Sequence, residues 1–505
     1  MPLAFPQELI KLKYKIRDIA VCYGLDFYEV IFEMLDYDEM NMVAAYTGFP
    51  SRYPHWRFGM EYEHLRKSYS YGLSKIYEMV INNDPCYAYL LSSNSNTDHK
   101  IVMAHVYGHC DFFKNNYWFS KTNRKMVDEM ANHGTKIAEY MDDHGVEEVE
   151  NFVDTCLSLE NLIDAHSVFI ERHGKKKDET GKYSKPHVTR FRAKDYMDSF
   201  INPKEFIEEQ EKAIQDKIKK QIKFPAEPER DVLAFLVEHA PIAPWKRNIL
   251  SMIREEAYYF APQRQTKIMN EGWASYWHST MMTRDLCTDA EIIDYADHHS
   301  GTLASRPGAI NPYKVGIELF RDIEDRWNKG KFGKEYEDCD DMTERRKWNL
   351  DLGLGREKIY QVRRIHNDVT FIDEFFNQEF CDDQKLFVYG YDPNAQQYVI
   401  LDRDHRKVKQ KLLFSLTNAG EPFIYVYDAN YKNRGELLLK HDFSGMGLKL
   451  DHAQDTLKNL FNVWTRPVNI DTYVGKKRIV MSYDGENHTQ EVIPEKEKKE
   501  VKKTD

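Results

Sequence analysis

The spacing of apolar residues changes near residue 350 of this 505-residue chain, and this change constrains the fold more than any other feature. Up to about residue 345, apolar side chains recur at helical spacing, as in Leu9, Leu12 and Ile16. Later segments are short, rich in β-branched and aromatic residues and bounded by turn residues, namely 385–392, 397–402, 422–429 and 478–485. We expect an α+β protein with a large, mainly α-helical N-terminal domain (1–348) and a smaller, strand-containing α+β domain (349–494).

Two segments carry too much charge to bury a face. Residues 171–187 combine glycine, proline and dense charge, which predicts an exposed loop. Residues 495–505 are nearly all Lys, Glu and Asp, which predicts a disordered tail. In the second domain, Asp451 with Gln454 three residues later predicts a capping box that opens a helix running to Trp464.

The overall charge argues against nucleic-acid binding. The formal charge is −11 and the pI is near 6.0, whereas a nucleic-acid binder presents a basic surface to the phosphates. The seven cysteines are scattered and include no CxxC pair, which argues against a disulfide framework or a zinc ribbon. Because the sequence shows neither a signal peptide nor about 18 consecutive apolar residues, we expect a soluble, cytoplasmic protein with no membrane span.

A pair of histidines is the sharpest local feature. His105 and His109 lie four residues apart in AHVYGHCDFF (104–113), a segment with helical spacing. Four residues turn a helix by about 40° beyond one full turn, so both imidazoles project from one face at a separation that suits metal chelation. Such pairs also arise by chance in a chain with 19 histidines, and hydrogen bonds hold buried histidines more often than metals do.

A second segment offers the further ligand that a two-histidine chelate needs. In NEGWASYWH (270–278), Glu271, Ser275 and His278 occupy one stripe of a predicted helix. We expect Glu271 to be the third ligand of a zincin-like metal site built on two helices, and His278 to be a fourth ligand or a catalytic group facing the substrate. Two imidazoles and a carboxylate favour zinc, with iron or manganese as alternatives.

This ligand set resembles the zinc site of gluzincin-type metallopeptidases, in which His-Glu-x-x-His is followed far downstream by a helical Glu. The likeness fails at Val106, which stands where those enzymes place the general base that activates water. Either another carboxylate fills this role, or the site binds metal without peptidase chemistry. Glu160 is our catalytic candidate for the displaced base, and the other acids in view are Glu61, Glu63, Glu255 and Glu256.

Two further groups are weaker candidates. His298 and His299 are adjacent, so they point in different directions on a helix and one of them is expected at the surface. Tyr313 and Arg321 lie in NPYKVGIELFRDIEDRW (311–327), which reads mostly as a core helix. Either side chain would suit polarisation of a substrate oxygen.

Several segments together resemble the SpoVR family, named after stage V sporulation protein R. They are residues 105–116, 270–278, 311–327, 366–376 and 465–472. The resemblance runs from about residue 7 to 485 and implies a role in building the peptidoglycan cortex of the spore, in the mother-cell cytoplasm of a spore former. The family also occurs in bacteria that do not sporulate, alongside a serine protein kinase and a von Willebrand-type protein, which implies these partners and a broader role in stress.

Three hypotheses for function follow. The first is a metal-dependent hydrolase of peptide or amide bonds, in which His105, His109 and Glu271 hold the ion and His278 stabilises the developing oxyanion. The second is a non-catalytic regulatory or scaffold protein derived from a metallopeptidase-like fold. It is considered because an enzyme without the general base would lose roughly 10²–10⁴-fold in reaction rate. The third is a redox iron protein that uses the same four side chains.

Overall fold

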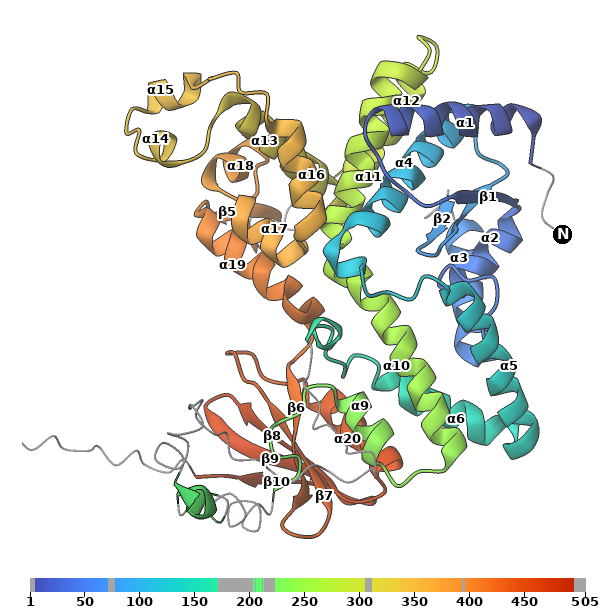
Figure 1. The fold of residues 1–505 in the computed structure, drawn as a ribbon, viewed down its shortest axis with the longest axis vertical. Helices are drawn as coiled ribbons and strands as arrows, with labels where there is room; N and C mark the ends of the chain where they lie inside the picture. Colours follow the sequence, from blue (N-terminus) through green and yellow to red (C-terminus); the bar gives the residue numbers. More distant parts are fainter. Residues whose placement is uncertain are drawn as a thin grey trace, which may run out of the picture. The chain divides into compact units, whose positions relative to one another are not determined.

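A computed structural model describes most of the chain, and its described residues form two compact units (Figure 1). The described residues are 5–70, 78–170, 203–204, 206–210, 212, 223–304, 311–392 and 396–494. The predicted loop 171–187 and the predicted tail 495–505 lie outside them. Each unit combines two separate stretches of sequence, Met1–Glu150 with Tyr258–Glu421 in the first and Asn151–Ala257 with Pro422–Asp505 in the second.

The expected division after residue 348 does not coincide with these units. Residues 349–421 pack within the first unit, because α16 (Gly355–Ile365) and α17 (Asp368–Phe375) contribute to its core. Ile359 of α16 and Phe371 of α17 are fully buried in that core. Sequence order does not show which distant stretch an amphipathic helix will pack against.

Helices dominate the first unit, as the apolar spacing predicted. They are α1 (Gln7–Cys22), α2 (Tyr37–Ala45), α3 (Trp56–Ser70), α4 (Asn96–Asn115), α5 (Met126–His144), α11 (Lys267–Met281), α12 (Ile292–Leu303), α13 (Pro312–Lys329), α14 (Lys334–Glu337), α15 (Met342–Lys347), α16, α17, α18 (Gln378–Asp383) and α19 (His405–Leu416). Short helical turns occur at η1 (Tyr117–Phe119), η3 (Met282–Leu286) and η4 (Thr417–Gly420). Two helices, α6 (Val146–Ser158) and α10 (Pro244–Gln265), carry the chain from one unit into the other. No helix among the described residues is long and apolar enough to cross a bilayer.

The first unit also contains a three-stranded sheet that the sequence pattern did not reveal. Its order is β1-β3-β2, with β1 (Val30–Leu35) parallel and β2 (Glu78–Ile81) antiparallel to the central β3 (Cys86–Leu91). Strands buried on both faces are short, continuous apolar runs, which periodicity alone does not distinguish from a buried helix. The sheet packs on α4, where the ring of Phe32 lies 5.7 Å from that of Tyr107.

The strands expected after residue 385 are confirmed. β4 (Val388–Asp392) and β5 (Gln397–Asp402) form a two-stranded hairpin in the first unit. The second unit holds a five-stranded sheet of order β10-β9-β8-β7-β6, built from β6 (Ile424–Tyr431), β7 (Glu436–His441), β8 (Val468–Val474), β9 (Lys477–Tyr483) and β10 (His488–Val492). Only the β7–β8 pair is parallel among these strands. The α+β class, mostly helical with a strand-containing C-terminal region, is therefore confirmed.

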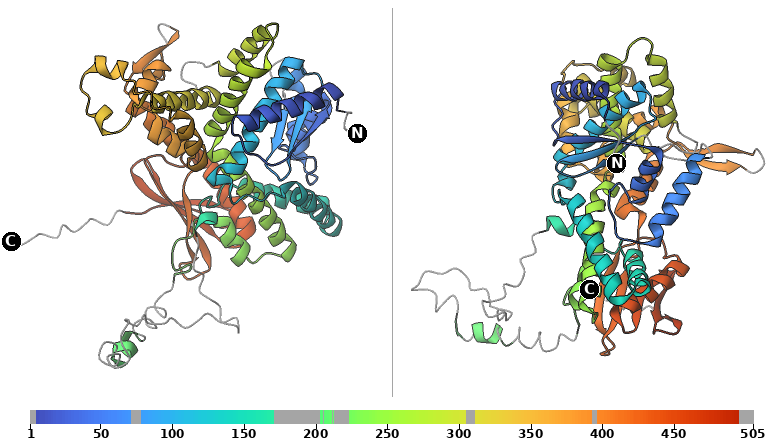
Figure 2. Two further views of the ribbon diagram at one scale, coloured as in Figure 1. Left: turned by 45° about the horizontal axis from the view of Figure 1, so that its top comes forward. Right: turned by 90° about the vertical axis from the view of Figure 1, so that its right-hand side faces the viewer.

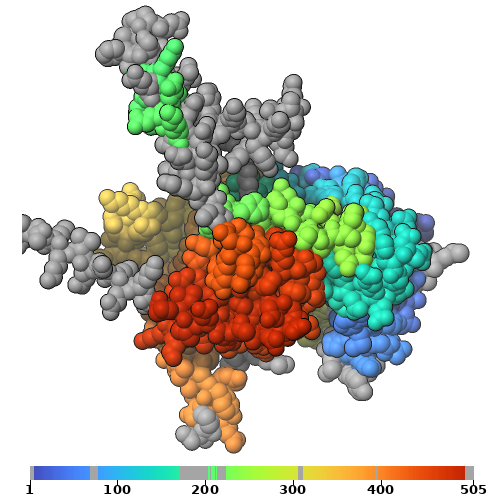
Figure 3. Space-filling view, turned by 90° about the horizontal axis from the view of Figure 1, so that it is seen from below, coloured from blue at the N-terminus to red at the C-terminus, as the bar shows by residue number. Residues whose placement is uncertain are grey.

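One face of the five-stranded sheet packs on α20 (Leu450–Trp464), through Leu457, Leu460 and Val463. The strands, coloured orange to red, lie together in both views of Figure 2. Helix α9 (Val232–His239) contacts β6, and Figure 3 shows its yellow-green surface beside the red surface of the sheet. A short helical turn, η2 (Ser167–Phe169), also lies in this unit.

The helix predicted from Asp451 is confirmed as α20, but its capping box is not formed. The helix begins at Leu450 after Lys449, and no side chain caps it. Asp451 instead accepts a hydrogen bond from the backbone N–H of His452, at 2.9 Å. A sequence match to S/T/D-x-x-E/Q gives the approximate start of a helix, whereas the cap also requires the first residue to have extended backbone geometry.

Three helices of the first unit pack at distances that only small residues permit. A Cβ added to Gly272 of α11 would lie 2.4 Å from the Cα of Gly316 in α13. A Cβ added to Gly108 of α4 would lie 2.7 Å from the Cα of Ala274 in α11. Observed Cβ atoms essentially never approach a neighbour within 3.0 Å. Helix α11 is therefore held closely between α4 and α13 by positions that accept no larger side chain.

The substitution Gly272→Ala is expected to destabilise the protein by at least about 1–3 kcal/mol, because its methyl group overpacks the α11–α13 contact. Thermal or urea unfolding measures the effect. The matched control is Gly59→Ala in α3, where an added Cβ meets no atom within 4 Å. This control should be neutral or stabilising by about 0.5–1 kcal/mol, because alanine favours a helix interior over glycine. Equal stability of Gly272→Ala and the wild type would contradict the close packing.

Candidate metal centre

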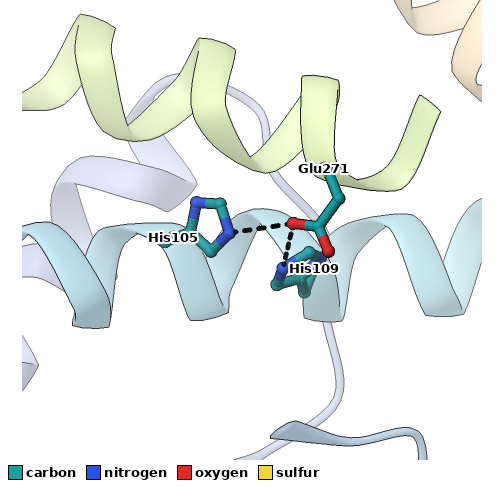
Figure 4. A group of neighbouring side chains, drawn as sticks. All are labelled: His105, His109 and Glu271. Atoms are coloured by element: carbon teal, nitrogen blue, oxygen red, sulfur yellow. Dashed lines mark ion pairs between the residues drawn. The ribbon is translucent and has the colours of Figure 1, made fainter. Parts of the chain in front are cut away.

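Helices α4 and α11 bring together the three side chains that the sequence singled out. The Nε2 atom of His105 lies 3.4 Å from Oε2 of Glu271, and Nε2 of His109 lies 3.5 Å from the same oxygen (Figure 4). One ligand atom from each residue lies within 4.8 Å of the other two. Both histidines come from one face of α4, and Glu271 reaches them from α11, as Figure 4 shows.

The spacing of these atoms suits a metal ion. In a tetrahedral site with bonds of about 2.0–2.2 Å, ligand atoms are separated by about 3.3–3.6 Å. The two N···O separations of 3.4 and 3.5 Å match this edge length. In addition, Oε2 of Glu271 is buried and makes no hydrogen bond with any described residue, although it lies within ion-pair distance of both imidazoles. A buried carboxylate oxygen without a partner is costly, and a cation bound to it would remove that cost.

The pKa values of the three groups shift in different directions. Burial raises the pKa of Glu271, but contacts with His105 and His109 outweigh it and hold that pKa well below its ordinary value. Burial, with His109 beside it, lowers the pKa of His105 to about 4. Burial also lowers the pKa of His109, but its contacts with Glu271 raise it more. An ionised Glu271 and a neutral His105 are the protonation states that metal ligation requires, whereas His109 holds a proton more readily than an ordinary histidine, and that proton competes with an ion.

Each histidine of the trio is oriented through its other ring nitrogen. Nδ1 of His109 lies 2.9 Å from Oδ1 of Asn270, and Nδ1 of His105 lies 2.9 Å from Nδ1 of His278. An Nδ1–H that donates to Asn270 leaves the Nε2 lone pair of His109 directed at the centre. An Nδ1–H of His105 that donates to His278 likewise leaves the Nε2 lone pair of His105 directed at the centre.

His278 therefore lies behind His105 and is not one of the three clustered ligand atoms. Its Nε2 is 3.3 Å from Nδ1 of His299 on α12, so three histidines form a chain from the centre to a half-buried ring. Burial, with His105 and His299 nearby, holds the pKa of His278 well below the ordinary value. Both of its nitrogens have partners, which suits an orienting role. The predicted catalytic role of His278 remains a prediction.

The acids considered as a displaced base do not join the cluster. Glu160 follows α6 in the second unit, and its role remains a prediction. Glu255 and Glu256 lie on the part of α10 that belongs to the same unit. Glu61 and Glu63 are on α3, where Glu63 pairs with Arg66 at 3.2 Å on the helix surface.

Another helix and a strand bring two further side chains within electrostatic range of the candidate ligands. Tyr313, a candidate from the sequence, lies on α13 with its ring stacked on that of His105 at 6.3 Å, and burial followed by the charge of Glu271 raises its pKa. Glu78 at the start of β2 interacts electrostatically with His109 and Glu271. Sequence reasoning missed Glu78 because no motif surrounds it and its strand was not predicted.

Comparison with known proteins identifies the family. A family model described as SpoVR like protein matches residues 5–421. The chain belongs to the SpoVR family. A SpoVR-like relative, the uncharacterized protein YcgB of Escherichia coli (strain K12), is 28% identical over 482 residues, which cover 89% of each chain. No solved structure matches this SpoVR protein. Family membership implies a role related to sporulation.

A buried carboxylate joins α4 and α11, the two helices of the candidate centre in this SpoVR protein. Asp111, two residues after His109 on α4, accepts a hydrogen bond of 2.7 Å from Nε1 of Trp273, two residues after Glu271 on α11. Its other oxygen accepts the backbone N–H of Asp26 at 2.8 Å, and Arg363 approaches within 3.6 Å. Burial raises the pKa of Asp111 to about 6 despite Arg363. This hydrogen bond restrains the rotation of α4 and α11 close to the candidate ligand residues.

A second buried carboxylate, Asp368, lies in the segment HNDVTFIDEFF (366–376) and stabilises the first turn of α11. Asp368, at the start of α17, accepts backbone N–H groups of Ile268 at 2.8 Å and Met269 at 2.9 Å, in the first turn of α11. Thr266 is the N-cap residue of α11, and its side chain makes no capping hydrogen bond. Burial raises the pKa of Asp368 to about 7, although both hydrogen bonds act to lower it. Asp368 thus caps, from a distant helix, the turn that precedes Glu271.

The substitution Asp368→Ala is expected to destabilise the protein by about 2 kcal/mol or more, because it removes a cap and leaves two buried N–H groups without an acceptor. Thermal unfolding measures the loss. Asp373→Ala on the exposed part of the same helix is the control and should change stability by less than about 0.5 kcal/mol. Similar losses in the two variants would contradict the capping role.

Proposed function

We propose that this SpoVR protein is a metal-dependent hydrolase of peptide or amide bonds that acts in formation of the spore cortex peptidoglycan. His105, His109 and Glu271 would hold one divalent ion. The observation that carries the proposal is the buried Oε2 of Glu271, which has no hydrogen-bond partner and lies 3.4–3.5 Å from two imidazole nitrogens. Two helices locked together by Asp111 and Trp273 hold this arrangement in place.

Zinc is the ion that this donor set favours. Two imidazoles and one carboxylate form the protein ligand set of several catalytic zinc sites, in which the fourth position stays open for water or substrate. Iron or manganese would accept the same donors. A divalent ion in this position supplies a Lewis acid that polarises a carbonyl and acidifies water. His278 would orient His105 through its 2.9 Å contact.

A regulatory or scaffold protein is the second candidate. It is favoured by Val106, which is fully buried in the core where the related metallopeptidases carry their base. In this alternative the centre is structural or vestigial, and the protein works through partners such as a serine protein kinase and a von Willebrand-type protein. Both candidates place the protein in the cytoplasm, in the mother cell of a spore former, with a wider role in stress.

Elemental analysis of protein purified without an affinity tag tests the metal centre. About one equivalent of zinc, iron or manganese is expected in the wild type, and none in His105→Ala or Glu271→Ala, because each variant removes a ligand. His405→Ala is the control, since Nδ1 of His405 bonds to Gln378 at 2.9 Å and takes no part in the trio. A folded, stable wild type without metal would rule out the metalloenzyme. Bound iron together with oxygen consumption would favour redox chemistry.

Peptide cleavage tests the hydrolase itself. The metal-loaded wild type and Glu271→Ala are incubated with a pool of synthetic peptides and with soluble cell-wall peptides, and mass spectrometry records new ends. Cleavage is expected only in the wild type and should stop when a chelator removes the ion. A metal-loaded, folded wild type that cleaves none of these substrates would favour the scaffold.

A further inference from the structure

A cavity of about 450 Å³ lies between α2 and α3 of the first unit, two helices that contact one another and lie side by side in Figure 1. Its lining comes from α2, from the segment that joins the two helices and from α3, within residues 38–62. Pockets of about 300–1,000 Å³ are the usual size of small-molecule sites. The three residues of the candidate metal centre are not among those that line it, so this cavity is a separate feature of the first unit.

Aromatic rings set at steep angles to one another form much of the cavity wall. The ring of Phe58 lies 5.3 Å from that of Tyr46 at an angle of 83°, and 5.5 Å from that of Tyr53 at 62°. The rings of Tyr53 and His55 meet at 84°. Tyr62, on α3, completes the aromatic lining. Because the faces of these rings point in different directions, they suit a rounded group better than a flat one.

The carboxylates that line the cavity lie beside these rings. Asp38, in the first turn of α2, is exposed, and the neighbouring Glu39 is half-buried. Oδ1 of Asp38 accepts a hydrogen bond of 3.4 Å from the hydroxyl group of Tyr62, so its carboxylate lies against the aromatic lining. None of the described residues that line the cavity is a lysine or an arginine. Carboxylates beside aromatic faces are complementary to a positively charged ligand.

Two of the rings also interact with a cation of the chain itself. The guanidinium group of Arg52 lies 5.1 Å from the ring centre of Tyr53 and 5.0 Å from that of Phe58. Arg52 is not one of the residues that line the cavity. Its positive charge opposes a second cation nearby, and the carboxylates of Asp38 and Glu39 offset that charge.

The rest of the lining favours one kind of cation. Met42, Ala45 and Pro54 add apolar groups to the wall. A primary ammonium has three N–H donors and is strongly hydrated, so it would lose water contacts that an apolar wall does not replace. A quaternary ammonium has no N–H donor, and its methyl groups pack well against rings and apolar side chains. The cavity therefore suits a methylated ammonium better than a primary one.

We propose that this cavity binds a small solute that carries a quaternary ammonium group. The cation lies among the aromatic rings, and Asp38 supplies the opposite charge at the exposed end of the cavity. The site shares no residue with the candidate metal centre, so it does not depend on the proposed hydrolase.

Three related ligands test the charge and its methylation. Choline carries the quaternary ammonium, ethanolamine is its unmethylated counterpart, and the alcohol with carbon in place of the nitrogen is its uncharged counterpart. Isothermal titration calorimetry measures the binding of each to the full chain. Choline should bind about 5–30-fold more tightly than the uncharged alcohol, and also more tightly than ethanolamine. No binding of choline would overturn the proposal, as would equal or tighter binding of either counterpart.

Variants of the lining locate the site. Gly59→Leu should block binding, because Gly59 lines the cavity and an added Cβ there meets no atom within 4 Å, which leaves open space for the new side chain. Asp38→Asn should weaken choline binding by about 2–5-fold and leave binding of the uncharged alcohol unchanged. Tyr62→Leu should also weaken choline binding, whereas Tyr62→Phe keeps the ring and should not. Glu61→Gln removes an exposed charge of α3 outside the lining and is the control.

Thermal unfolding shows whether each variant is folded. Gly59→Leu should be at least as stable as the wild type, because leucine favours a helix interior over glycine. Choline binding that is unchanged in both Gly59→Leu and Asp38→Asn would place the ligand elsewhere and overturn the proposal. Tighter binding of a peptide that carries trimethyl-lysine than of choline would make the occupant a side chain of a partner protein, and would overturn the assignment to a small solute.

Discussion

The close packing of α11 between α4 and α13 is the constraint on which the candidate centre depends. Gly272 faces Gly316, and Gly108 faces Ala274, at separations with no room for another side chain. Glu271 immediately precedes Gly272, so the same contact that brings the backbones together delivers its carboxylate to the imidazoles of α4. In a looser helix pair the carboxylate would not reach both histidines, because side chains fill the space between ordinary helices at 8–10 Å.

Buried polar groups around the centre are paired with one another in a way that fixes its geometry. Asp111 joins α4 to α11 through Trp273, and Asp368 caps the first turn of α11. Asn270 and His278 hold the outer nitrogens of the two imidazoles. Because an unpaired polar group is costly in a protein interior, each pair resists rotation or sliding of the helices. Oε2 of Glu271 makes no hydrogen bond with a described residue and lies 3.4–3.5 Å from the Nε2 atoms of both imidazoles.

The resemblance to the zinc sites of metallopeptidases covers the three candidate ligands and fails at the position of the base. The histidine pair and the downstream Glu occupy the expected helices, yet Val106 is fully buried in the hydrophobic core. The arrangement therefore resembles those sites in its three candidate ligands and differs from them at the position of the base.

The sequence by itself determined the helices and the orientation of side chains along them. Spacing of i and i+4 placed His105 and His109 on one face of α4, and local periodicity located α11, α13 and α20, because these depend on neighbours within one or two turns. Tertiary structure alone decided the rest. The three-stranded sheet, the cap from Asp368 and the packing of residues 349–421 with the first unit all join residues far apart in the chain, and no local pattern encodes which distant surface will cover an apolar face.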